Sequence, residues 1–93
     1  MVIDLKHIES NVRILNAIEF AILSYARAQK VLGNPYQYFS EQLGYKSKNY
    51  LYRWFQERGM VKIGLDDLKK IILITGNKEL ANILCEEIKK WVQ

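Results

Sequence analysis

Five polar side chains in the segment 48–58 are of the types that read the base edges of DNA. They are Lys48, Asn49, Tyr52, Arg53 and Gln56. On a helix that turns by about 100° per residue, they fall within an arc of about 140° that holds no acidic residue. Lysine and arginine donate hydrogen bonds to guanine, and asparagine and glutamine pair with adenine. The spacing therefore predicts a helical face that contacts DNA, with an ordinary solvated face as the alternative.

The opposite side of the same predicted helix is apolar. It carries Leu51, Trp54 and Phe55, together with Tyr50, whose hydroxyl we expect at the surface. Because an apolar stripe on a short helix must pack against something, we expect this side in the core. The polar side then faces outward.

Further polar residues flank this helix. Lys46 and Ser47 precede it, Arg58 and Lys62 follow it, and Gln37 lies near the start of the preceding predicted helix. Contacts with phosphate position a protein on DNA without reading its sequence. We therefore expect these five residues at the DNA backbone.

The basic charge of the chain is concentrated in its middle third. The formal net charge is +4. Residues 27–62 hold seven lysine and arginine residues against Glu41 and Glu57, an excess of five, whereas the flanking parts together contribute −1. A localised basic excess is typical of proteins that bind a polyanion, although proteins that bind nothing acidic also show it.

The residues offer little for catalysis or metal binding. One histidine, His7, and one cysteine, Cys85, exclude paired-histidine and cysteine-based metal sites and an internal disulfide framework. Asp66 and Asp67 adjoin in sequence but point about 100° apart on a helix, where we interpret them as favouring the helix dipole. With no nucleophile–base pair and no glycine-rich phosphate loop, we expect no enzyme, no cofactor and no small-molecule ligand.

The chain shows no membrane or targeting segment. Its most apolar stretch, 12–32, is interrupted by Arg13, Glu19 and Arg27, and the first ten residues lack the pattern of a signal peptide. We therefore expect a cytoplasmic protein.

Glycines and the single proline divide the chain into five predicted helices. We expect a compact all-α domain over 1–93, with helices in the regions 1–32, 35–43, 48–58, 65–75 and 78–92. In the region 1–32, one long helix and a short lead-in followed by a helix from about residue 11 fit the apolar spacing equally well. We expect Asn34, Ser47 and Asn77 to cap the helices that follow them, and Gln37 to complete a capping box with Asn34.

The segment 35–58 fits a helix-turn-helix unit. Phe39 and Leu43 would pack inward, the small Ser40 would allow two helices to approach closely, and Gly44 would make the turn. In such units the second helix lies in the major groove of DNA.

The stretch from Gln37 to Ile83 resembles the lambda-repressor-like helix-turn-helix regulators of phage, most of all the phage CII-type regulatory proteins. The resemblance rests on Phe39-Ser40-x-x-Leu43-Gly44, on Leu51-Tyr52-Arg53-Trp54, and on the segment 63–71 with Thr75-Gly76-Asn77. It implies a dimeric, sequence-specific regulator that acts on phage or host promoters. The turn between Gly44 and Leu51 is one residue longer than in these repressors, and the N-terminal helix has no counterpart in them.

These observations together predict a small transcription regulator that binds double-stranded DNA as a homodimer. Dimerisation would use the N-terminal helix (1–32), the last helix of the C-terminal helix pair (65–92), or both, through apolar positions beyond those one small core needs. These are Ile14, Ala21, Ile22, Ile88 and Trp91. A helical protein-interaction module, such as an anti-repressor or adaptor that does not bind DNA, is the alternative, and a nonspecific nucleic-acid binder is a third.

Overall fold

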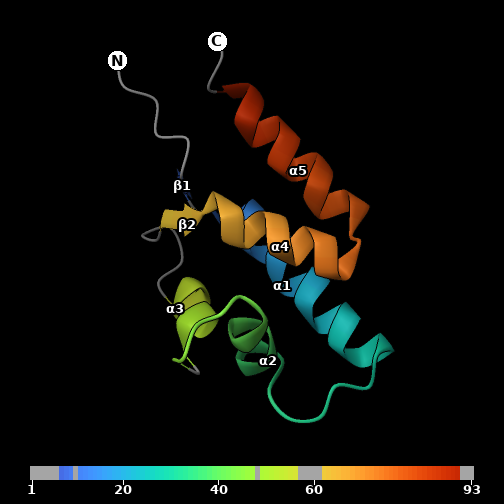
Figure 1. Ribbon diagram of the computed structural model, residues 1–93. Helices are drawn as coiled ribbons and strands as arrows, with labels where there is room; N and C mark the ends of the chain where they lie inside the picture. The colour runs from blue at the N-terminus through green and yellow to red at the C-terminus, as the bar shows by residue number, and fades with distance from the viewer. Residues whose placement is uncertain (1–6, 10, 48, 57–61, 91–93) are drawn as a thin grey trace.

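The computed structural model describes residues 7–9, 11–47, 49–56 and 62–90 (Figure 1). In chain order the elements are β1 (His7–Glu9), α1 (Val12–Ala28), α2 (Pro35–Gln42), α3 (Tyr50–Gln56), β2 (Lys62–Gly64), α4 (Leu65–Thr75) and α5 (Lys78–Lys89). Over the described residues, the predicted compact all-α fold with five helices is confirmed. The short sheet of β1 and β2 was not predicted.

The first helix is shorter than the region 1–32 assigned to it, because α1 begins at Val12 and ends at Ala28. Asn11 has extended backbone and its side chain accepts a hydrogen bond from the Ile14 amide at 2.9 Å, so it caps the helix. Of the two possibilities for this region, the lead-in followed by a helix from about residue 11 is the one observed. At the other end, both Lys30 and Gly33 take the left-handed backbone conformation, with φ of 53° and 84°.

Caps define the other helices largely as the sequence indicates. The side chains of Asn34 and Asn77 accept hydrogen bonds from amides in the first turns of α2 and α5, and Pro35 is the first residue of α2. Gly76 ends α4 with φ of 63°. One half of the expected capping box is present, because the backbone N–H of Gln37 donates to the Asn34 side chain at 3.4 Å. The side-chain amide of Gln37 donates instead to Glu41, also at 3.4 Å.

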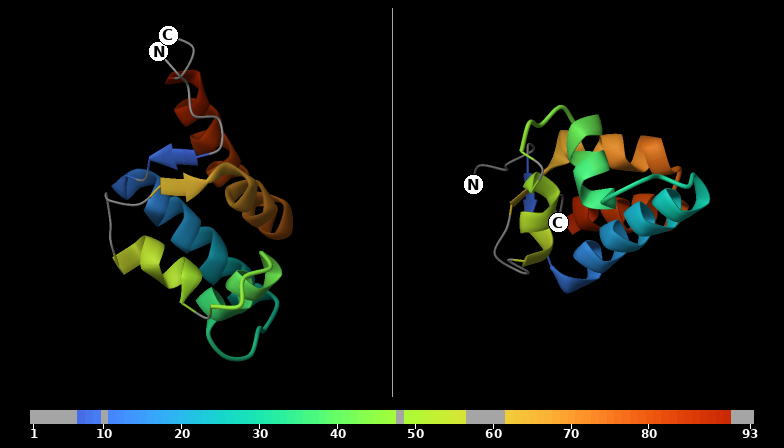
Figure 2. Two further views of the ribbon diagram at one scale, coloured as in Figure 1. Left: turned by 60° about the vertical axis from the view of Figure 1, so that its left-hand side comes forward. Right: turned by 90° about the horizontal axis from the view of Figure 1, so that it is seen from below.

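The helix α1 is central, since it packs against all four of the other helices (Figure 2). Ile14, Ala21 and Ile22, expected as spare apolar positions for dimerisation, are fully or almost fully buried within the chain. The prediction for these three residues is wrong for a physical reason. A helix with neighbours on several sides uses two apolar stripes, one more than a helix lying against one side of a core.

The strands β1 and β2 tie the start of the described chain to the start of α4. The two strands lie side by side and pair antiparallel (Figure 2). Ile8 stands opposite Ile63, and both isoleucines are buried. Because α4 begins directly after β2, this pairing fixes the N-terminal end of α4.

None of the helices in the described ranges is long and apolar enough to cross a membrane.

Candidate nucleic-acid interface

A buried serine joins α2 to α3. The Ser40 side chain is fully buried, and its hydroxyl donates to the Tyr36 carbonyl at 2.8 Å. The same oxygen accepts the backbone N–H of Leu51, in the first turn of α3, at 3.3 Å. A larger side chain at position 40 would separate the two helices, so the expectation of a small residue at a close approach is met.

The chain turns between these helices at Gly44, which has φ of 89°. The Gly44 amide donates to the Glu41 carbonyl and the Tyr45 amide donates to the Ser40 carbonyl, each at 3.0 Å. Only glycine adopts this backbone conformation without strain, so the residue type and the turn agree.

The two sides of α3 differ as the spacing predicts. Leu51, Trp54 and Phe55 are buried, and Tyr50 is half-buried. Asn49, Arg53 and Gln56 are exposed, and Tyr52 is 42% exposed with its ring edge-on to Tyr36 at a centroid distance of 5.6 Å. The described part of α3 spans Tyr50–Gln56, and the predicted contacts Lys48 and Arg58 lie outside the described residues.

The other predicted contact residues differ in their exposure. Lys46 and Ser47 are exposed in the turn before α3, and Lys62 is exposed on β2. The Ser47 hydroxyl accepts from the Asn49 amide at 3.3 Å, which bends the chain toward α3 one turn before the helix begins. Gln37 is half-buried on α2, where its amide is engaged by Glu41.

A cluster that the sequence did not predict holds the turn from the side of α4. We call it the Tyr45–Tyr50–Asp67 cluster. Asp67 is only 7% exposed, and its Oδ2 accepts the hydroxyl of Tyr45 at 2.8 Å and that of Tyr50 at 3.1 Å. The two tyrosine rings stack with centroids 3.7 Å apart. Burial, followed by the Tyr45 hydroxyl and the Asp67 carboxylate, raises the pKa of the Tyr50 phenol above its ordinary value of 10.0.

Helical spacing could have identified Asp67. It precedes the buried Ile71 by one turn and therefore shares its face, whereas Asp66 points to solvent. A dipole effect accounts for Asp66, but it does not explain why the Asp67 carboxylate is buried.

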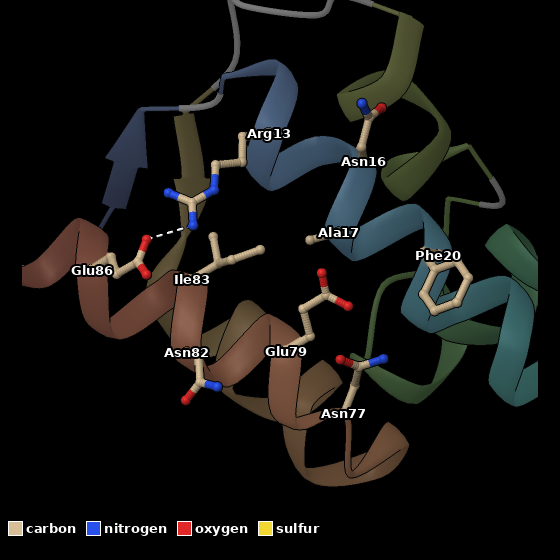
Figure 3. Close-up of a pocket in the computed structure, with 9 residues that line it drawn as sticks. All are labelled: Arg13, Asn16, Ala17, Phe20, Asn77, Glu79, Asn82, Ile83 and Glu86. Atoms are coloured by element: carbon tan, nitrogen blue, oxygen red, sulfur yellow. Dashed lines mark ion pairs between the residues drawn. The ribbon is translucent and has the colours of Figure 1, made fainter.

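A separate groove of about 620 Å³ lies between α1 and α5 (Figure 3). Arg13 and Glu86 form an ion pair across it at 2.6 Å, and Ala17 and Ile83 line its floor. Phe20 borders the groove and is 62% exposed. The groove is formed by helices other than α2 and α3, so its occupant would not cover the polar face of α3.

No family model, no curated protein and no solved structure matches this chain. The resemblance of residues 37–83 to phage regulators therefore stays a prediction from the sequence.

Proposed function

We propose that this protein is a sequence-specific regulator of transcription, of phage or prophage type, that places α3 in the major groove of double-stranded DNA. One observation carries the proposal. Arg53 and Gln56 are exposed on a helix whose opposite side is in the core, and Asn49 is exposed just before that helix, so the core does not need these polar residues. The protein would act in the cytoplasm.

The dimensions of α3 suit this role. An α-helix with its side chains is about 10–12 Å across, and the major groove is about 12 Å wide, so α3 can enter the groove. Asn49 stands just before the helix, where a helix-turn-helix protein contacts base edges, and Arg53 follows one turn later. Asparagine suits adenine and arginine suits guanine, while Lys46 and Ser47 would contact phosphate.

We further propose that the protein binds DNA as a homodimer through α1, with or without α5. Two of the apolar side chains on the outside of α1, Val12 and Phe20, are more than half exposed, and Leu23 is partly so. These residues replace Ile14, Ala21 and Ile22 as the basis for dimerisation. On α5, Ile88 is half-buried, and Trp91 lies outside the described residues.

A helical protein-interaction module is the alternative, and the groove between α1 and α5 favours it. Exposed Phe20 offers an apolar contact in the groove that Ala17 and Ile83 also line, and the other lining residues include glutamates and asparagines. Such a module would use this groove and would not depend on the polar face of α3.

The test is a selection of binding sites from a random duplex library at one fixed salt concentration, because affinity for DNA depends steeply on salt. The unsubstituted protein is compared with the Lys46→Ala/Arg53→Ala variant. Lys78→Ala/Lys89→Ala is the control, since it removes the same charge from exposed positions on α5.

A regulator would enrich a palindromic consensus with half-sites about one DNA turn apart, and the α3 variant alone would lose it. Binding without a consensus would indicate a nonspecific binder. No binding would contradict the proposal and favour the interaction module.

A further inference from the structure

The N-terminal end of α3 is held by contacts far away in sequence. A helix of seven residues is too short to be stable by itself, so tertiary contacts set where it lies. Ser40 supplies one such contact, from α2 to the Leu51 amide. The Tyr45–Tyr50–Asp67 cluster supplies another, from α4.

The cluster holds both ends of the segment that carries predicted DNA contacts. Tyr45 precedes Lys46 and Ser47, and Tyr50 follows Asn49. Both phenols donate to the same oxygen of Asp67, at 2.8 and 3.1 Å, and their rings stack with an interplanar angle of 16°. Hydrogen bonds to an ionised acceptor are the strong ones, and two that share one oxygen leave their donors little freedom. Lys46, Ser47 and Asn49, which are exposed between these two tyrosines, are therefore confined.

Asp67 itself is not suited to contact DNA. Its carboxylate is almost fully buried, and an exposed negative charge there would repel phosphate. A Cβ added at Gly64 would come within 3.1 Å of its Oδ2, so the backbone between β2 and α4 also packs closely against the carboxylate. The strand pairing that fixes the start of α4 thus fixes the carboxylate as well.

We propose that Tyr45, Tyr50 and Asp67 are positioning residues for DNA recognition, which hold the turn before α3 against α4 and so determine which bases Asn49 and Arg53 can reach. This inference rests on the proposed function. It assigns specificity to residues that need not touch DNA, because displacing α3 by about one ångström would misalign paired hydrogen bonds to a base.

The test uses Tyr45→Phe and Tyr50→Phe, which keep the rings but remove the hydroxyl groups. Tyr36→Phe is the matched control, since it removes a phenol–carboxylate bond of 3.0 Å to Glu19 between α2 and α1. Two quantities are measured at a temperature where every variant is folded. They are the hydrogen-exchange rates of the backbone amides at 46–51 without DNA, and the ratio of affinities for the selected duplex and a duplex changed at one base pair.

We expect the backbone amides at 46–51 to exchange faster in both cluster variants. The affinity ratio should fall about tenfold, which is roughly the discrimination that one base contact provides. Their binding to unrelated DNA should change little, since Lys46 and Arg53 remain. Asp67→Asn keeps an acceptor oxygen without the charge. We expect its affinity ratio to lie between that of the phenylalanine variants and that of the unsubstituted protein. The control should retain the full ratio.

The outcomes separate this inference from the proposed function. An unsubstituted protein that binds no duplex contradicts both. A protein that selects a consensus, but whose cluster variants keep the affinity ratio, contradicts the positioning role alone. If a phenylalanine variant fails to fold, Asp67→Asn decides, and an unchanged ratio in that folded variant overturns the inference.

Discussion

The Tyr50 phenol has one chemical property that a single substitution can test. It donates to a buried carboxylate, and burial raises its pKa above 10.0. In the folded protein this phenol therefore keeps its proton at a pH where the unfolded chain has lost it.

We expect the free energy of unfolding to fall as the pH rises above 10.0 toward the higher pKa of folded Tyr50. Below 10.0 both states keep the proton, so this contribution is fully present there. The Tyr50→Phe variant should lose part of this pH dependence, because one shifted phenol has been removed. Urea unfolding at several alkaline pH values measures it. Tyr52→Phe is the control, and equal slopes in the two variants would contradict the assignment.

Two basic residues near α3 should have different roles. Arg53 lies on the outward side of α3, and Lys46 lies in the turn before it. We expect Arg53→Ala to weaken the free energy of DNA binding by about 1–3 kcal/mol and to relax the base preference at one position of the site. Lys46→Ala should weaken binding to all sequences alike and reduce the slope of log affinity against log salt by about 1. Titrations of each variant with DNA at several salt concentrations distinguish these two roles. If both variants had the same salt dependence and the same base preference, separate base and phosphate roles would be excluded.

At the scale of elements, α3 depends on its neighbours more than on its own sequence. It is short, and its apolar side packs in the core through Leu51, Trp54 and Phe55. Two polar contacts add to this packing, one from α2 through Ser40 and one from α4 through Asp67, and each can be removed singly.

We expect Ser40→Ala to lower the free energy of unfolding by about 1–3 kcal/mol, because the buried Leu51 amide loses its acceptor. Ser40→Val should lower the free energy of unfolding by about a further 1–3 kcal/mol, because the larger side chain overpacks the contact between the helices. Ser47→Ala, at an exposed position, is the control. Urea unfolding gives the values, and a Ser40→Ala protein as stable as the control would show that this bond does not hold the two helices together.

For the whole molecule, the arrangement around α1 decides which apolar residues are left for a partner. With its inner side chains buried among four helices, α1 exposes Val12 and Phe20 at its outer side. A homodimer through α1 would cover them.

We expect the protein to sediment as a dimer at micromolar concentration and Phe20→Glu to sediment as a monomer with unchanged helical content. A charge buried in an apolar interface without a partner opposes association. Leu73→Glu, at an 81% exposed position on α4, is the control and should remain dimeric. A monomer for the unsubstituted protein would contradict the dimer, and loss of dimer in both variants would contradict the assignment to α1.

The sequence by itself determined where most helices begin and end and which side of α3 is polar. These features depend on residues within a few positions of one another, such as Asn34 with Pro35, or Gly76 with Asn77. Tertiary structure decided the burial of both stripes of α1, the pairing of Ile8 with Ile63, and the turning of Asp67 toward Tyr45 and Tyr50. Each of these joins residues far apart in the chain, from 17 positions for Asp67 and Tyr50 upward. Local patterns do not specify such pairings, because any of several apolar or polar partners would satisfy them equally well until the chain is packed.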